Sequence, residues 1–196
     1  MTSESRSGEQ PTVQQSKRYE EFAYVLDFIP RGKSSIIKER EGPLIQAIGE
    51  DHLTLLEILA AKSTDFKPGE RISIGREHRT KIVSVLGKLD YSELSNEARN
   101  ELEPVLENMI VQNEPRFIAY FNELQPITPR LHALELIPGI GKTFMRQIIN
   151  QRGKKKFDSF EELERRVGLR EPVKLLAKRI IEELSGGSRI MLFAHR

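Results

Sequence analysis

The spacing of apolar residues changes at Tyr91, and this change constrains the fold more than any other feature of the 196-residue chain. Between Glu21 and Asp90, short segments rich in β-branched and aromatic residues alternate with turn-forming residues, which is typical of a small sheet or barrel. After Tyr91 apolar residues recur every three or four positions, which indicates amphipathic helices. We therefore expect an α+β protein, with a small OB- or SH3-like β-barrel followed by an α-helical domain.

Five strands are expected in the first part, separated by turn residues. They cover Phe22 to Ile29, Leu44 to Ile48, Leu53 to Leu59, Arg71 to Gly75 and Lys81 to Leu89. The turns are Pro30-Arg31-Gly32, Gly49-Glu50-Asp51 and Lys67-Pro68-Gly69-Glu70. So many short strands predict a barrel over residues 19–90, preceded by a disordered tail at 1–18 rich in Ser, Glu and Gln.

Two acidic helices are expected in residues 91–128, as a connection that covers part of the core. Ser95 is a plausible N-cap of the first, and Pro104 kinks or splits it. The second runs from Glu114 to Leu124, with Pro115 in its first turn. The predicted apolar faces comprise Ala98, Leu102, Val105, Leu106, Met109 and Ile110 in the first helix and Phe117, Ile118, Phe121 and Leu124 in the second.

The last domain, residues 129–196, shows four helical patterns and a final strand-like pattern. The helices cover Leu131 to Ile137, Lys142 to Gln151, Ser159 to Val167 and Pro172 to Leu184, and the strand covers Arg189 to Ala194. The four helices could form two hairpins related by a pseudo-twofold axis. This domain carries 15 Lys and Arg against eight Asp and Glu, so the positive charge of the chain is concentrated here.

A phosphate-binding turn is expected between the first two of these helices, at Pro138-Gly139-Ile140-Gly141. Two glycines around one apolar residue allow a tight turn that presents backbone N–H groups at the start of the next helix, where unsatisfied amides and the helix dipole favour an anion. Ile140 should point into the core against Leu134, Ile148 and Ile149. The candidate nucleic-acid-binding residues are Pro138, Gly139, Ile140, Gly141, Lys142, Thr143, Arg146, Arg152, Lys154, Lys155 and Lys156.

A second contact surface is possible on the loops of the barrel, and simpler interpretations stay open for both surfaces. The barrel candidates are Arg31, Lys33, Arg76, Arg79 and Lys81. Tyr24 and Phe28 could stack on bases, but aromatic residues in short strands are more often part of the core. The run Lys154-Lys155-Lys156, which we place about two helical turns from the hairpin, could equally be a solvated loop.

Several kinds of chemistry are disfavoured, and we expect no enzyme, no cofactor and no metal site. The chain has no cysteine, and its four histidines lack ligand spacing; His132 is better explained as a capping or packing residue. Gly32-Lys33-Ser34 and Gly141-Lys142-Thr143 end like a nucleotide-binding P-loop, but Asp27 and Leu136 occupy the positions of its first glycine. Lys142 and Asp158 do not match the catalytic positions of base-excision glycosylases. No apolar run approaches the roughly 18 residues of a membrane span. The absence of cysteine fits an intracellular location, so a cytoplasmic protein is expected.

The segment from Leu134 to Lys142, followed by Ile148-Ile149 and Arg152, resembles the helix-hairpin-helix motif of DNA repair, recombination and uptake proteins. The segment from Phe157 to Leu163 is similar to the element that follows the hairpin in the tandem form. Two departures are Met145, where many members have a small residue, and Val167-Gly168-Leu169-Arg170-Glu171-Pro172 in place of a second Gly-x-Gly. We expect one phosphate-binding hairpin and a second that is structural.

A wider resemblance, to the archaeal DUF655 family, covers about residues 19–196. It rests on Ala23-Tyr24-Val25-Leu26-Asp27, Leu55-Leu56-Glu57, Pro68-Gly69-Glu70-Arg71, Asn113-Glu114-Pro115-Arg116-Phe117, Gln125-Pro126-Ile127-Thr128 and Pro172-Val173-Lys174-Leu175. The resemblance implies a β-barrel before a helix-hairpin-helix domain, with nucleic acid as the suggested ligand. Genes of the family commonly neighbour those for a ribosomal protein and ribosomal-RNA methylation, which implies an RNA setting.

The function expected from the sequence is sequence-tolerant, non-catalytic binding of nucleic acid through its phosphates. Structured RNA, ribosomal RNA above all, is favoured, with an association with the ribosome or with ribosomal-RNA processing. DNA is the nearest alternative, because a contact to phosphates does not read the 2′-hydroxyl group. A third interpretation is an adaptor whose barrel docks a protein partner.

Overall fold

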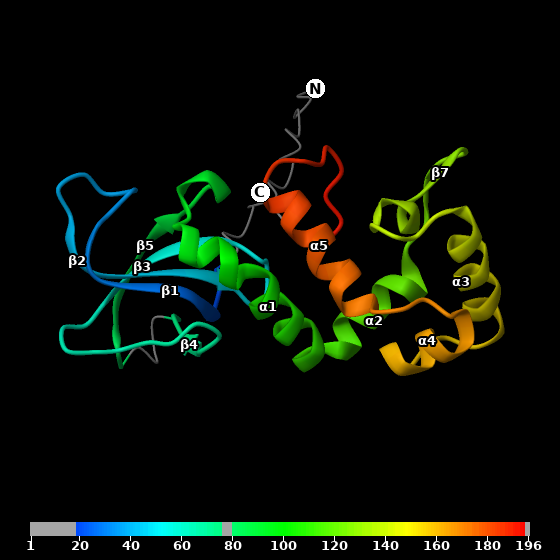
Figure 1. The fold of residues 1–196 in the computed structure, drawn as a ribbon, viewed down its shortest axis with the longest axis horizontal. Helices are drawn as coiled ribbons and strands as arrows, with labels where there is room; N and C mark the ends of the chain where they lie inside the picture. Colours follow the sequence, from blue (N-terminus) through cyan, green and yellow to red (C-terminus); the bar gives the residue numbers. More distant parts are fainter. Residues whose placement is uncertain (1–18, 76–79, 195–196) are drawn as a thin grey trace, which may run out of the picture.

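The computed structural model describes residues 19–75 and 80–194, and in it the strands of the main sheet precede the helices along the chain (Figure 1). The strands of the main sheet are β1 (Phe22–Lys33), β2 (Glu41–Gly49), β3 (Leu55–Ala60), β4 (Arg71–Ser73) and β5 (Ile82–Lys88). The elements that follow are the 3₁₀ turn η1 (Tyr91–Glu93), α1 (Asn96–Gln112), α2 (Glu114–Glu123), β6 (Pro126–Thr128), β7 (Leu131–His132), η2 (Ala133–Leu136), α3 (Lys142–Lys154), α4 (Phe160–Val167) and α5 (Pro172–Leu184). The tail expected at 1–18 and the barrel candidates Arg76 and Arg79 lie outside the described residues.

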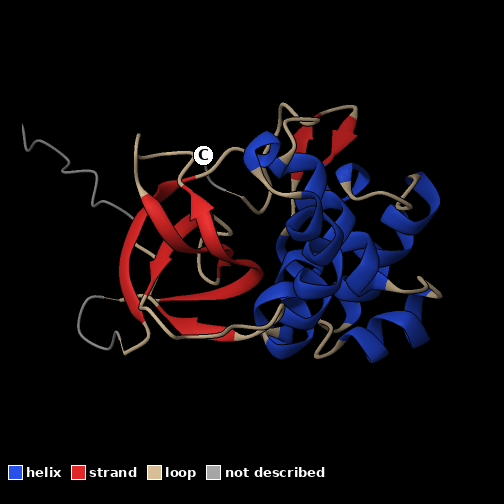
Figure 2. Cartoon of the chain, turned by 60° about the vertical axis from the view of Figure 1, so that its left-hand side comes forward, coloured by secondary structure: helices blue, strands red, loops and turns tan. Residues whose placement is uncertain are grey.

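The five expected strands form one curled antiparallel sheet in the order β4-β1-β2-β3-β5, so the mixed α+β class is confirmed (Figure 2). The sheet is a half-barrel, because within the described residues its two edge strands, β4 and β5, do not pair with each other. The turn expected at Pro30-Arg31-Gly32 is wrong. There β1 continues to Lys33, and a register shift between Ile29 and Gly32 bends the strand while it stays paired with β2.

Alternation along β1 gives the sheet two apolar faces. Ala23 and Val25 point into the half-barrel, while Tyr24 and Leu26 point toward the helices. The cluster on the helical side is continuous from Leu26 of the sheet to residues of α3, α4 and α5, so sheet and helices share a core.

Helix α1 is the central element of this shared core, because it packs against β1 on one side and α5 on the other (Figure 1). All six apolar residues predicted for its inner face are buried. Its N-cap is Ser95, as expected: the Ser95 hydroxyl accepts the Ala98 N–H at 2.9 Å and donates to Asp27 Oδ2 of β1 at 2.7 Å. Pro104 does not split the helix, which runs unbroken to Gln112.

The C-terminal part differs from the sequence prediction at both ends. The helix expected over Leu131 to Ile137 is wrong: Leu131 and His132 form β7, which pairs with β6, and only one 3₁₀ turn, η2, fits before Pro138. The strand expected over Arg189 to Ala194 is also wrong. Backbone N–H groups there, from Leu192 to Ala194, donate to the carboxylate of Glu183 on α5.

Candidate nucleic-acid interface

The turn between η2 and α3 is held by the core, as the sequence predicted. Ile140 is 3% exposed, and its N–H donates to the carbonyl of Ile137 at 3.0 Å, which closes the turn. Leu134 and Ile148 are fully buried in the same cluster. Ile149 does not join them: it is 37% exposed on the outer side of α3, so this part of the prediction is wrong.

The two glycines of the turn have different structural roles. Gly139 has φ +84°, a left-handed conformation that favours glycine, and a Cβ there would lie 3.2 Å from Leu175 Cδ2. Gly141 has φ −85° and ψ −177°, which any residue can adopt, and a Cβ there would meet no atom within 4 Å. The fold therefore requires a glycine at 139, whereas at 141 neither the backbone angles nor the surrounding atoms require one.

The first turn of α3 has no capping group and no negative charge. Gly141 is the N-cap and offers no side chain, and the next residue is Lys142, which opposes the helix dipole. The first intrahelical bond joins the Met145 N–H to the Gly141 carbonyl. Within residues 19–75 and 80–194, we find no acceptor for the N–H groups of Gly141, Lys142 and Thr143. These amides can bind an anion at the exposed end of α3.

The outer face of α3 carries positive charge and no acidic residue. Lys142, Thr143 and Arg146 are all exposed, and the helix contains no Asp or Glu. Arg152, also a predicted contact residue, lies elsewhere. Its guanidinium is partly buried and donates to the carbonyls of Phe121 and Leu124 at the end of α2, at 2.9 and 2.8 Å. Burial lowers the pKa of Arg152, and its contacts give it a structural role in joining α3 to α2.

The three lysines of the Lys154-Lys155-Lys156 run lie at the opposite end of α3 from the hairpin. The helix has 13 residues, so its ends are about 20 Å apart, farther than the two turns expected. Lys155 Nζ lies 2.8 Å from Asp158 Oδ2 and 3.6 Å from a Glu162 oxygen, and the hydrogen bond to Asp158 raises the pKa of Lys155. Lys156 lies 3.9 Å from Glu123, so Lys154 alone of the three has no ion pair in the described chain.

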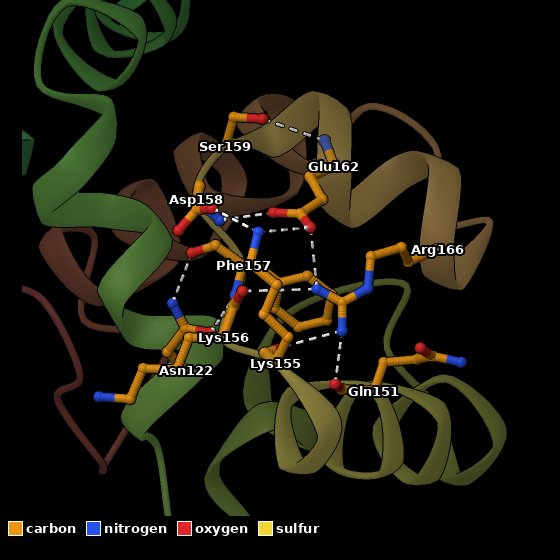
Figure 3. A network of polar contacts seen from close by, with 9 residues as sticks. All are labelled: Asn122, Gln151, Lys155, Lys156, Phe157, Asp158, Ser159, Glu162 and Arg166. Atoms are coloured by element: carbon orange, nitrogen blue, oxygen red, sulfur yellow. Dashed lines mark hydrogen bonds and ion pairs between the residues drawn. The ribbon is translucent and has the colours of Figure 1, made fainter.

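A residue that the sequence analysis missed, Arg166, holds the loop that carries these lysines (Figure 3). Its guanidinium donates to the carbonyls of Gln151 and Lys155, pairs with Glu162 at 3.1 Å, and stacks 4.5 Å from the centre of the Phe157 ring. Asn122 of α2 fixes the same loop through both backbone groups of Phe157. The i, i+4 spacing of Glu162 and Arg166 can be recognised in the sequence. The backbone carbonyls that accept hydrogen bonds from Arg166 cannot.

His132 caps η2, in agreement with the capping role predicted for it. Its Nδ1 accepts the Leu134 N–H at 3.1 Å, and Glu135 accepts the His132 N–H at 3.0 Å. Burial, followed by the nearby positive charge of Arg152, lowers the pKa of His132. The imidazole is therefore neutral at physiological pH and accepts a hydrogen bond directly before the hairpin.

Comparison with known proteins places this architecture in a family. The model of the family described as "Protein of unknown function (DUF655)" matches residues 19–195. The chain belongs to the DUF655 family. The "Uncharacterized protein MJ0038" of Methanocaldococcus jannaschii is 39% identical over 175 residues, which are 89% of this chain and 79% of that protein. The crystal structure of the DUF655 protein Af1531 from Archaeoglobus fulgidus superimposes with a TM-score of 0.81 at 38% identity, over 90% of this chain and all of that one.

On the barrel of this DUF655 chain, two of the three described candidate cations are paired with carboxylates. Lys33 lies 3.3 Å from Glu41, and Lys81 lies 3.8 Å from Glu70, while Arg31 is exposed. Tyr24 and Phe28, the candidates for stacking on bases, are part of the core, which agrees with the simpler interpretation. Tyr24 is 1% exposed, and Phe28 packs edge-on against Phe66. In the described part of this DUF655 protein, no helix is both long and apolar enough to cross a membrane.

Proposed function

We propose that this DUF655 protein binds the phosphate backbone of structured RNA, without catalysis, through a helix-hairpin-helix unit formed by η2, the turn at Pro138 to Gly141, and α3. The observation that carries the proposal is the open, unstrained position of the glycine at 141. Neither its backbone angles nor its surroundings require a glycine, while a phosphate that approaches the amides of Gly141 and Lys142 would require one.

The charges of α3 support the same proposal. A helix that starts with a glycine cap and a lysine is less stable than one that starts with a hydrogen-bonding cap and an acid, by a few tenths of a kcal/mol for the cap and up to about 1 kcal/mol for the charge. A bound phosphate removes both disadvantages, because it accepts the free N–H bonds and neutralises the positive end of the dipole. The glycine cap and the lysine in the first turn weaken the helix by itself but favour a bound anion. Local choices of this kind, which lower stability, are typical of binding sites.

RNA is the preferred ligand because of the RNA setting implied by the family resemblance, and DNA is the alternative. On the barrel, Lys33 and Lys81 are paired with carboxylates, which disfavours a second nucleic-acid contact there, since cations in such pairs are already neutralised. Contacts to phosphates alone predict weak sequence preference and a steep dependence of affinity on salt.

The test compares Gly141→Ala with wild type by fluorescence anisotropy, using a labelled structured RNA. The added methyl group meets no protein atom, so the variant should stay folded, with an unfolding midpoint only slightly below that of wild type. It should bind about tenfold more weakly or worse, as expected when a charge-assisted contact is displaced. Lys142→Ala should also weaken binding. Lys62→Ala, which removes an exposed charge on the barrel, is the matched control and should bind as wild type does. Unchanged affinity of Gly141→Ala would refute the proposal.

Absence of catalysis is tested on the same RNA. Incubation of the protein with end-labelled RNA should leave the RNA intact. Cleavage that copurifies with the protein and disappears in Lys142→Ala would show that the hairpin has a catalytic function.

A further inference from the structure

Gly141 shares an unusual property with one other glycine, Gly153. Every other glycine in the described residues has either a positive φ or a protein atom within 4 Å of the position of its missing Cβ. Gly141 and Gly153 have neither, and Gly153 lies inside a helix, where glycine is about 1 kcal/mol less favourable than alanine. Neither a positive φ nor a close contact therefore requires a glycine at either position.

Both of these glycines lie on α3, one at each end. Gly141 is the N-cap, and Gly153 is the penultimate residue of the helix. Gly153 follows Lys142 by eleven residues, which is three turns, so both lie on the same side of the helix. The Lys142 amide and the open backbone at Gly153 are thus about 17 Å apart along one helix face, while Gly141 lies about a third of a turn away around the axis.

The surface between the two glycines is polar, and α3 contributes no negative charge to it. The exposed cations are Lys142, Arg146 and Lys154, and the exposed uncharged polar residues are Thr143, Gln147 and Asn150. Each of the other four described α-helices contains at least two acidic residues, so this composition is particular to α3. A partner that fits this face carries negative charge along about 20 Å and offers hydrogen-bonding groups between its charges.

The face has no platform for stacking bases. Tyr19 is the only aromatic residue of the described chain whose side chain is exposed, and it lies at the start of the sheet. Proteins that bind single strands combine a basic groove with exposed aromatic side chains. The exposed apolar residue on α3 is Ile149, which can contact a sugar but cannot stack like an aromatic ring.

We infer that α3 lies across the minor groove of double-helical RNA, with its Gly141 end on the phosphates of one strand and its Gly153 end on those of the other. This inference rests on the proposed function and names the class of nucleic acid. The A-form minor groove is wide and shallow and displays 2′-hydroxyl groups, which suit the side chains of Thr143, Gln147 and Asn150. The minor groove of B-form DNA is about 6 Å wide and does not admit a helix, which favours RNA over DNA.

Gly153→Ala in the full-length protein tests this inference, because the variant should be more stable and yet bind less. Alanine favours the helix, so the unfolding midpoint should rise, while the methyl group at the second contact should weaken binding to an RNA duplex of about 16 base pairs by about five- to tenfold. Asn100→Ala is the matched control. It also replaces an exposed helical residue by alanine, but on α1, and should leave binding unchanged.

Each outcome of the anisotropy titrations has a distinct meaning. If Gly141→Ala weakens binding and Gly153→Ala does not, the two-ended contact is wrong while the proposed function stands. If Gly141→Ala keeps the affinity of wild type, the proposed function itself is wrong, whatever the effect of Gly153→Ala. Wild type should bind the RNA duplex more tightly than the same sequence as single-stranded RNA or as duplex DNA. Equal or tighter binding of either competitor would overturn the assignment to double-helical RNA.

Discussion

The buried guanidinium of Arg179 donates to Glu183 Oε1 at 3.0 Å, one turn farther along α5. Arg179 also donates to the Ser188 hydroxyl and to the carbonyl of Ile190, and the Glu183 carboxylate accepts N–H groups of the 192–194 segment. The pair therefore fastens the C-terminal segment to α5 without a strand. Here the charged side chains of Arg179 and Glu183 make the hydrogen bonds to the backbone that a neighbouring strand would otherwise make.

Glu183→Gln should destabilise the protein by about 3 to 5 kcal/mol, because it removes the buried counter-charge of Arg179 and leaves only the partly exposed Glu182 beside it. Urea unfolding followed by circular dichroism measures the change. Glu182→Gln is the matched control: Glu182 also pairs with Arg179, but its side chain is 42% exposed, and the expected loss is below about 1 kcal/mol. Equal effects of the two variants would contradict the structural role of Glu183.

Gly139→Ala and Gly141→Ala should separate stability from binding. Alanine at 139 must adopt φ +84° close to Leu175, so the free energy of unfolding should fall by about 1 to 3 kcal/mol. Alanine at 141 meets no atom but is a poorer N-cap than glycine, so the free energy of unfolding should fall by no more than about 1 kcal/mol. Urea titrations of both variants check this difference. A large loss of stability in Gly141→Ala would mean that the turn does require a glycine there.

Arg152→Gln should lower stability by about 1 to 3 kcal/mol, since it removes charge-assisted bonds to the carbonyls of Phe121 and Leu124. Its guanidinium already has protein partners, so the slope of log affinity against log salt should not change. Titrations at several salt concentrations, below the unfolding transition, test this point. A smaller slope of log affinity against log salt in the variant would show that Arg152 contacts a phosphate.

The dependence of RNA affinity on salt should also show which basic residues contact phosphates. Removing Lys142 and Arg146 together should reduce the slope on a duplex by about 0.9 for each phosphate that these two side chains neutralise. Lys155→Ala with Lys156→Ala should reduce it less, because both lysines already pair with carboxylates. The reverse order would place the main phosphate-binding residues in the lysine loop.

Stability should fall as the pH drops through the range where His132 titrates. The pKa of His132 is lowered in the folded protein, so the unfolded chain binds more protons between that value and 6.5. The contribution of neutral His132 is fully present above about pH 6.5 and is lost below its folded pKa. His132→Asn keeps a capping acceptor without a titrating group, so its stability should depend less on pH over this range. Identical pH profiles of the two proteins would refute this role.

Much of the fold could be predicted because its signals are local. The inner face of α1 follows from the spacing of apolar residues alone, and all six predicted residues are buried. The helix expected over Leu131 to Ile137 failed because pairing of Pro126 with His132 takes these residues into a hairpin. The roles of Arg152 and Arg166 could not be predicted, since their acceptors are carbonyls that only packing brings near.

The sequence by itself determined that the main sheet precedes the helices, that a tight turn lies at Pro138 to Gly141 and that positive charge is in excess in the C-terminal domain. Periodicity, turn chemistry and charge depend on neighbouring residues, so they can be read along the chain. Only the tertiary structure distinguished Gly139 from Gly141 and related Gly141 to Gly153. The reason is physical: whether a glycine is required depends on its φ and on the atoms that a Cβ would meet, and packing of distant segments decides both.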